Sequence, residues 1–132
     1  MAMLRSDITI DRPAEEVWAV VSDAGRISEW FPSIVTPSAN SDERSCELEG
    51  GVPLTEGVVT NDSSLRRFQY RITGGGVPVE SQLGTVDVLA LDSGRSLVVC
   101  STEVTPDELA GALGPAIDDG VKGLKEHCER RG

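Results

Sequence analysis

The spacing of apolar and polar residues predicts one strand and two short helices at the start of the chain. Apolar and polar residues alternate from position 4 to position 10, which is typical of a strand with one mostly apolar face. Pro13 then favours the first turn of a helix, and the two glutamates that follow favour the positive end of its dipole. Gly25 is expected to end or break this helix, and residues 26–30 are expected to form one more helical turn, which Pro32 stops.

The middle of the chain is predicted to form six further strands. Apolar stretches are separated by clusters of glycine, asparagine, aspartate and serine, which favour tight turns. Such short connections imply that consecutive strands are antiparallel neighbours. The predicted strands cover residues 34–39, 44–49, 52–60, 64–73, 81–91 and 95–104.

After Pro106 the apolar spacing changes to three or four residues, as on one face of a long helix. A helix from there to about Arg130 would be about 36 Å long, and Pro115 is expected to kink it or weaken its first half. The residues of the apolar face are Leu109, Leu113, Ile117, Val121, Leu124 and Cys128. The small residues expected to leave space beside this helix include Ala112, Ala116, Gly120 and Gly123.

This order of elements predicts an α+β fold. An antiparallel sheet of about seven strands and one long helix with an apolar stripe can both be buried only if the sheet wraps around the helix. The two short helices are expected to close one end of the sheet.

Composition narrows the possible classes of protein. The chain has 132 residues, the usual size of one domain, so residues 1–132 are expected to form one domain. The formal net charge of -10 disfavours nucleic acids and anionic membrane surfaces as partners. No apolar run approaches the roughly 20 residues that cross a bilayer, and the N-terminus lacks the pattern of a signal peptide. A cytoplasmic protein without membrane insertion is therefore expected.

The cysteines and the single histidine predict no disulfide and no metal site. Cys46, Cys100 and Cys128 are odd in number and widely separated, so reduced thiols that are partly buried are expected. His127 has no second histidine or cysteine at metal-ligand spacing, and its position suits interaction with a helix C-terminus. No serine-hydrolase motif or phosphate-binding loop is present, and no cofactor is predicted.

Five segments, in this order and spacing, resemble the START-like helix-grip superfamily (SRPBCC) and, within it, the polyketide cyclase/dehydrase-like family. They are IDRPAEEVWAVVSD (10–23), EWFPSIV (29–35), RFQYRI (67–72), VPVES (77–81) and GTVDVLAL (84–91). The resemblance covers nearly the whole chain and implies a helix-grip fold with a deep cavity between the sheet and the long helix. Relatives use this cavity for lipid or hormone binding or for aromatic polyketide cyclisation, and other relatives make chaperone contacts. The chain departs from the family where Glu56 is followed by Gly57 and not by arginine, which puts a role for a basic group there in doubt.

Strand alternation predicts which side chains face this cavity. On the strand 64–73 the apolar residues predict that Phe68, Tyr70 and Ile72 point inward. The strand 95–104 carries apolar residues on both faces, and its alignment with the resemblance favours an inward face formed by Leu97, Val99, Ser101 and Glu103. The predicted ligand-binding residues are Trp30, Phe31, Phe68, Tyr70, Gln82, Val86, Val99, Ser101, Leu113, Ile117 and Val121.

Three residues are candidates for catalysis. Glu56 and Glu103, if buried in an apolar cavity, would have raised pKa values that suit general acid or base chemistry on a carbonyl compound. Alternatively, both lie at the cavity rim or pair with arginines. Tyr70 could donate a hydrogen bond to a ligand oxygen, or could simply pack its ring and satisfy its hydroxyl locally.

Three of the five aromatic residues gather near the two short helices. Trp18 is expected to pack the first helix into the core. For Trp30 and Phe31, core packing and a place at the cavity entrance both stay open.

These observations give three hypotheses about function. The leading one is binding of a small hydrophobic or amphipathic molecule, lipid-like or similar to an aromatic polyketide. The second is a cyclase or dehydratase that uses the cavity carboxylates and Tyr70. The third is a protein-interaction domain of the chaperone-activator kind, which needs no open cavity. The pattern predicts neither the identity of the ligand nor the oligomeric state.

Overall fold

The computed structural model describes residues 1–31, 34–39, 42–48 and 51–130, and the side chains of all these except 34–38. The described elements are β1 (Ala2–Ile10), α1 (Ala14–Val21), the 3₁₀ helix η1 (Ala24–Glu29), β2 (Ile34–Ala39), β3 (Glu43–Leu48), β4 (Val52–Asp62), β5 (Arg67–Gly75), β6 (Ser81–Ala90), β7 (Ser96–Thr105), the 3₁₀ helix η2 (Asp107–Leu109) and α2 (Ala110–Arg130). The predicted stop at Pro32 lies outside the described residues.

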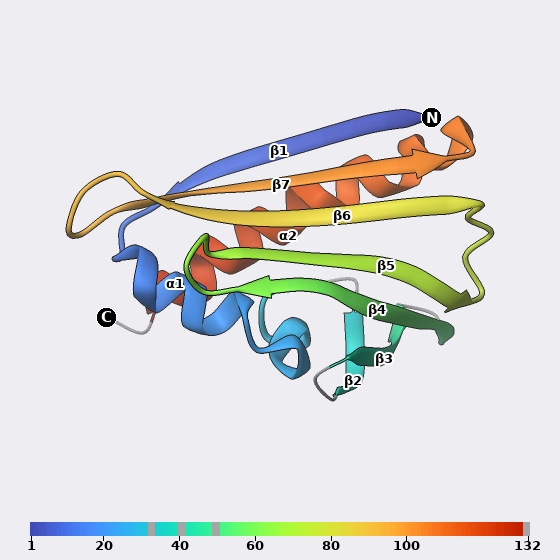
Figure 1. Ribbon diagram of the computed structural model, residues 1–132, viewed down its shortest axis with the longest axis horizontal. Helices are drawn as coiled ribbons and strands as arrows, with labels where there is room; N and C mark the ends of the chain where they lie inside the picture. The colour runs from blue at the N-terminus through green and yellow to red at the C-terminus, as the bar shows by residue number, and fades with distance from the viewer. Residues whose placement is uncertain (32–33, 40–41, 49–50, 131–132) are drawn as a thin grey trace.

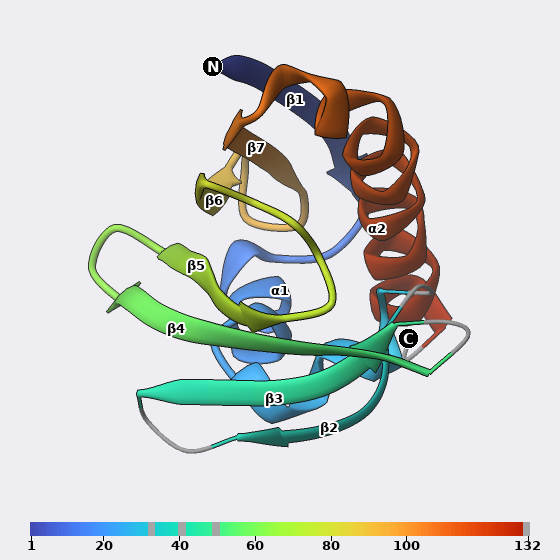
Figure 2. The same ribbon diagram turned by 90° about the vertical axis from the view of Figure 1, so that its right-hand side faces the viewer.

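The seven strands form one antiparallel sheet with the order β1-β7-β6-β5-β4-β3-β2. The sheet curves strongly, and α2 runs along its inner side next to β1, while α1 and η1 lie at one end (Figures 1 and 2). Bulges where β4 pairs with β5 add to this curvature, because an extra residue on one strand bends the pair. The predicted α+β helix-grip arrangement is therefore confirmed.

One difference at an element boundary is the start of β5. The prediction placed a strand from residue 64, but the chain turns between β4 and Arg67. The side chain of Asp62 accepts hydrogen bonds from the backbone N–H groups of Ser64 and Leu65, and Arg66 has a φ of 52°, in the left-handed region. These local bonds hold the turn, so the strand begins three residues later.

Helix α2 continues through Pro115 and is described as one helix of 21 residues. Its buried residues, Ile117, Gly120, Val121, Leu124 and Cys128, all follow Pro115. The residues before Ile117 are less covered, and this part of the helix, together with Ile117, borders the cavity described below.

The predicted orientation of β7 is wrong. Ser96, Val98, Cys100, Thr102 and Val104 are buried, and the alternate residues Leu97, Val99, Ser101 and Glu103 lie on the outer face, each only partly buried. Valines occur on both faces, so alternation could not decide between them. Because β7 is paired on both sides, with β1 and with β6, its outer-face side chains have neighbours on both sides, and they are partly buried.

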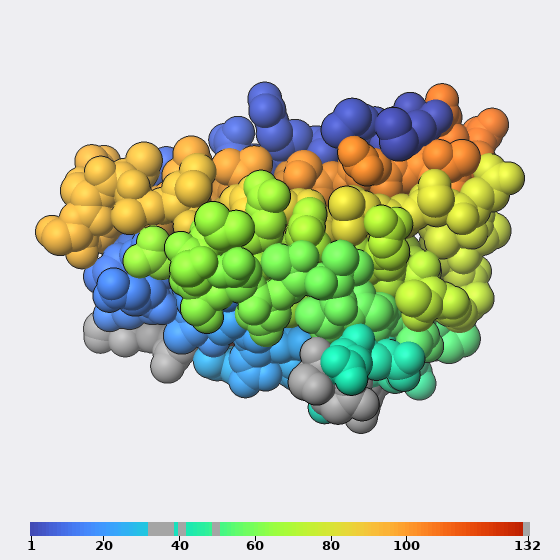
Figure 3. Space-filling model, in the orientation of Figure 1, coloured from blue at the N-terminus to red at the C-terminus, as the bar shows by residue number. Residues whose placement is uncertain are grey.

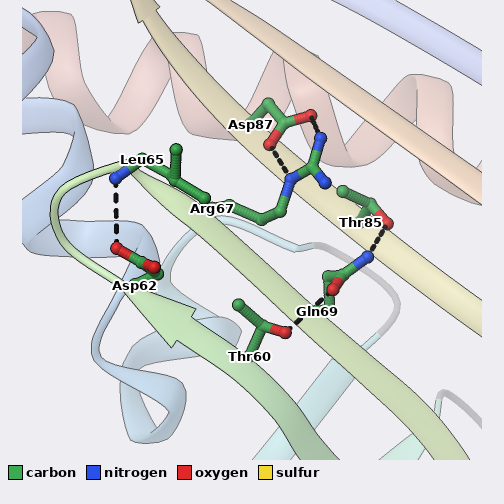
Figure 4. Close-up of polar contacts among 7 residues, drawn as sticks. All are labelled: Thr60, Asp62, Leu65, Arg67, Gln69, Thr85 and Asp87. Atoms are coloured by element: carbon green, nitrogen blue, oxygen red, sulfur yellow. Dashed lines mark hydrogen bonds and ion pairs between the residues drawn. The ribbon is translucent and has the colours of Figure 1, made fainter.

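The outer face of the central strands is held by polar contacts. Figure 3 shows this face as a surface formed by side chains of β1, β7, β6, β5 and β4, in the order of these strands across the sheet. Gln69 accepts a hydrogen bond from Thr60 Oγ1 at 2.8 Å and donates one to Thr85 Oγ1 at 3.0 Å (Figure 4). Beside it, Arg67 donates two hydrogen bonds to the carboxylate of Asp87. Arg67 and Gln69 therefore lie on the outer face of the sheet.

The core contains Trp18 and all three cysteines. Trp18 is buried, as predicted, and its indole N–H donates to Ser63 Oγ at 3.1 Å. All three cysteines are buried, and none of them forms a disulfide within the described residues. Burial raises the pKa of the Cys46 thiol to about 11 and that of the Cys100 thiol to about 12. Both thiols are therefore protonated and unreactive near neutral pH.

Candidate functional site

A cavity of about 300 Å³ lies between the inner face of the sheet and the N-terminal half of α2. Its wall is mainly apolar, with four polar side chains: Glu56, Tyr70, Gln82 and Thr102. The apolar lining residues are Ile27, Phe31, Leu48, Leu54, Ile72, Val77, Leu109, Ala112, Leu113, Ala116 and Ile117. Apolar walls with a few placed polar groups are typical of small-molecule sites.

Small residues of α2 make room for this cavity. Ala112 and Ala116 line it, as the sequence predicted for the small residues of the helix. One turn further on, a Cβ atom at Gly120 would lie 2.8 Å from Phe31 Cε2, so only glycine lets this ring rest on the helix. Phe31 thereby borders the cavity, while Trp30, 5.7 Å away between ring centroids, is buried in the core beside it.

A buried ion pair lies beside the cavity. Arg44 and Glu56 are opposite each other in the register of β3 and β4. Both side chains are only 4% exposed, and Arg44 Nε and Nη2 lie 2.8 and 2.6 Å from Glu56 Oε1. The sequence put a basic group in doubt because Gly57 follows Glu56, but the neighbouring strand supplies one.

Arg44 is held by more than this ion pair. Its Nη1 donates to the backbone carbonyl of Ala24 at 3.3 Å. Its guanidinium carbon lies 5.7 Å from the ring centroid of Phe68 and 5.5 Å from that of Tyr70. These distances allow cation–π attraction to both rings, which fixes the charge at the edge of the cavity.

Burial raises the pKa of the Glu56 carboxyl above its ordinary value, although the charge and hydrogen bonds of Arg44 act in the opposite direction. Burial also raises the pKa of the Tyr70 hydroxyl, and the nearby Glu56 adds to that shift. Tyr70 is therefore protonated throughout the physiological range. Two alternatives were open for Glu56, burial in the cavity and pairing with an arginine. The structure shows both, because Glu56 is buried in the cavity wall and pairs with Arg44.

This shift gives Glu56 a defined effect on stability. Because its pKa is higher in the folded than in the unfolded chain, the folded state binds the proton more tightly, and the contribution of Glu56 to wild-type stability falls as the pH rises above about 4.5. The free energy of unfolding of Glu56→Gln minus that of the wild type should therefore increase with pH, by up to about 1.4 kcal/mol per unit. Urea unfolding of both proteins over a pH series measures this difference in the free energy of unfolding. A difference that falls as the pH rises would contradict a raised pKa of Glu56 in the folded state.

The strands β5 and β6 separate next to the cavity. Their backbone pairing ends at Tyr70 and Gly84, and beyond this point the two strands diverge (Figure 1). The side chain of Gln82 bridges the gap, because its Oε1 accepts a hydrogen bond of 2.8 Å from the backbone N–H of Ile72. An amide side chain thus takes the place of a backbone partner at the cavity wall.

The structure divides the predicted site residues into three groups. Glu56 and the predicted ligand-binding residues Phe31, Tyr70, Gln82, Leu113 and Ile117 line the cavity. Buried in the core, outside the cavity lining, are Trp30, Phe68, Val86 and Val121. On the outer face of β7, against the predicted inward orientation, are Val99, Ser101 and Glu103.

Sequence reasoning missed Thr102 and several apolar lining residues. Thr102 belongs to the buried face of β7 and was lost with the wrong orientation of that strand. Leu48, at the end of β3, and Val77, in the connection between β5 and β6, line the cavity because the sheet curves, which the sequence pattern does not reveal. Leu109, by contrast, lies on the predicted apolar face of the C-terminal helix and could have been named.

The part of the chain that the structure describes contains neither a candidate metal site nor a candidate membrane-spanning helix. No group of three or more histidine, cysteine or carboxylate side chains there could hold a metal ion. None of the described helices combines the length and apolar character needed to cross a membrane.

Comparisons with solved structures show the same fold. The chain is similar to the protein XoxI from Bacillus cereus, with a TM-score of 0.89 and 24% identity over 96% of this chain and 94% of the other. It is also similar to the Zhui aromatase/cyclase from Streptomyces, with a TM-score of 0.84 and 18% identity over 98% and 94% of the two chains. A third similar structure is a START superfamily protein from Mycobacterium smegmatis, with a TM-score of 0.83 and 16% identity over 98% of this chain and 99% of the other.

A comparison with curated proteins gives no match. A family model described as "Polyketide cyclase / dehydrase and lipid transport" matches residues 1–129, which is nearly the whole chain. This match agrees with the helix-grip fold and with the mainly apolar cavity between sheet and helix. The chain therefore belongs to the polyketide cyclase/dehydrase and lipid transport family.

Proposed function

We propose that the protein binds a small hydrophobic or amphipathic molecule, lipid-like or similar to an aromatic polyketide, in the cavity between the sheet and α2. The observation that carries this proposal is the cavity of about 300 Å³ with mainly apolar walls, which is at the lower end of the usual size of ligand sites. Such a volume suits a compact molecule of one or two rings or a short acyl chain. The net charge of -10 supports a partner other than nucleic acid.

A second candidate function is a cyclase or dehydratase reaction on a carbonyl compound. Glu56 supports it, because burial raises the pKa of its carboxyl and favours proton exchange nearer to neutral pH. Tyr70 would then donate a hydrogen bond to the carbonyl oxygen that gains charge. Similarity to the Zhui aromatase/cyclase adds support from the fold alone.

The third hypothesis, a chaperone-activator-like interaction domain, finds less support. Such a domain would act through its sheet surface and could fill its core, whereas the cavity here is open enough for a ring system. We therefore place binding first, for one domain over residues 1–132 that acts in the cytoplasm.

Filling the cavity tests the proposal. Ala116→Phe places a ring in the cavity from the helix side, so binding of naphthalene, a compact apolar probe, should weaken about ten-fold or more while the protein stays folded. Ala90→Phe makes the same change at an exposed position of β6 and should leave binding unchanged. Binding is followed by changes in amide NMR signals of the lining residues. Equal binding by both variants would exclude the cavity as the site.

Native mass spectrometry of the purified protein identifies a natural ligand that stays bound during purification. A released aromatic or acyl compound would support binding and would supply a substrate for the Glu56→Gln and Tyr70→Phe variants. Conversion of this compound by the wild type but not by Glu56→Gln would favour the enzyme over the binding protein.

A further inference from the structure

We infer that the ligand carries an uncharged head group that both donates and accepts a hydrogen bond, and that Glu56 Oε2 and Gln82 Nε2 recognise it. This inference rests on the proposed function, since it concerns the polar end of the same cavity. A primary amide or a hydroxyl next to a carbonyl group has this chemistry.

Glu56 presents one carboxylate oxygen that the protein does not use. Both close contacts from Arg44 go to Oε1, at 2.8 and 2.6 Å. Within the described residues no hydrogen bond to Oε2 is found, although the side chain is only 4% exposed and lines the cavity. Oε2 is not among the fully buried polar atoms that lack a partner in the described residues, so it stays accessible, and a ligand that donates a hydrogen bond to it gains a charge-assisted contact.

Gln82 presents an unused donor in the same way. Gln82 is only 4% exposed and lines the cavity. Because the N–H of Ile72 must donate to an oxygen, the acceptor at 2.8 Å is Oε1, and Nε2 points elsewhere. In the described part of the chain no hydrogen bond from this Nε2 is found, and Nε2 is not one of the fully buried atoms without a partner, so it stays accessible at the cavity that Gln82 lines.

The two unused groups meet at one place in the sheet. Glu56 is the register partner of Ile72 across β4 and β5, and Gln82 binds the amide of the same Ile72 from the β6 side. One acceptor and one donor therefore flank Ile72 on the cavity wall. Tyr70, two residues earlier on β5, lies next to them and is the third polar group.

Charge disfavours the simplest alternative, a carboxylate ligand. Arg44 is already engaged by Glu56 Oε1, so the free Oε2 would repel an anion and offer it no hydrogen. A neutral head group avoids this repulsion. The mainly apolar remainder of the wall then receives the hydrocarbon part of the molecule.

Three probes that share one ring system test the head group at about pH 8. They are 2-naphthamide, which donates and accepts, methyl 2-naphthoate, which only accepts, and naphthalene, which does neither. The wild type should bind the amide about ten-fold more tightly than the ester, because only the amide can donate to Glu56 Oε2. Affinities are measured by NMR titration.

Glu56→Gln should reverse the preference. Its oxygen can still accept from Arg44, which turns its NH₂ group towards the cavity, so the variant presents two donors and favours the ester. Glu103→Gln is the matched control, because Glu103 lies on the outer face of β7, and it should keep the wild-type preference. Gln82→Met should weaken the amide and the ester alike. Binding of naphthalene shows in each case that the variant is folded.

Each outcome is decisive. A preference for the amide that Glu56→Gln removes and Glu103→Gln keeps supports the inference. Equal binding of amide and ester by the wild type, or an unchanged preference in Glu56→Gln, overturns it while cavity binding stands. If naphthalene binds as tightly as the amide, the head group is not recognised and the inference is wrong. If no probe binds, the proposed function itself fails for ligands of this size.

Discussion

Arg44→Met should lower the free energy of unfolding by about 3–5 kcal/mol near pH 8, because it leaves the carboxylate of Glu56 buried without its partner. Methionine fills most of the space of the arginine stem, so the lower free energy of unfolding results more from the lost charge than from lost volume. Urea unfolding followed by tryptophan fluorescence measures it. The loss should shrink at about pH 5, where Glu56 can take up a proton, since an uncharged carboxyl needs no cation.

Two further variants separate this effect from the general loss of an arginine. Arg67→Met breaks the pair with Asp87 on the outer face, where the Arg67 side chain is 43% exposed, and should cost about 1 kcal/mol or less. The double variant Arg44→Met, Glu56→Leu replaces the buried pair by apolar side chains and should recover most of the stability lost in Arg44→Met. If the double variant is less stable than Arg44→Met alone, the buried carboxylate is not the cause.

Gly84→Ala should lower stability by about 1–3 kcal/mol and also weaken binding in the cavity. Gly84 is the register partner of Tyr70, whose ring crosses over it. A Cβ atom at this position would lie 2.6 Å from the Tyr70 hydroxyl oxygen and closer still to the ring. The ring must therefore move, and the space open to it is the cavity that it lines.

Gly74→Ala is the matched control, because it makes the same change on β5. Its Cβ would meet Thr55 Cβ at 3.9 Å, an ordinary contact, so stability and binding should change little. Unfolding in urea and titration with naphthalene measure the two effects together. If Gly84→Ala binds as the wild type does, Tyr70 does not shape the cavity.

The sequence predicted the fold well because every element has its own local signal. Alternation, turn residues and the spacing of apolar residues after Pro106 each specify one element, and their order leaves few ways to bury a sheet and a long helix together. The start of β5 was placed too early because the side chain of Asp62 stabilises a turn that strand propensity does not reveal.

The site was predicted less well, for two physical reasons. A strand with valines on both faces, as in β7, carries no signal for its inner face, so Glu103 was assigned to the cavity and Thr102 was missed. The partner of Glu56 comes from another strand, and only the register that pairs Arg44 with Glu56 brings them together. Tyr70 and Gln82 were found because each lies on a strand with clear alternation.

The bond between Gln82 and Ile72 makes one backbone amide an indicator of events in the cavity. Its hydrogen is protected from solvent by a side chain and not by a neighbouring strand, so it can exchange with deuterium without any opening of the sheet. A molecule that engages Gln82 would slow this exchange at Ile72, whereas the amides of paired strands elsewhere would keep their rates. Occupancy of the cavity can thus be read at a single residue, with no label on the ligand.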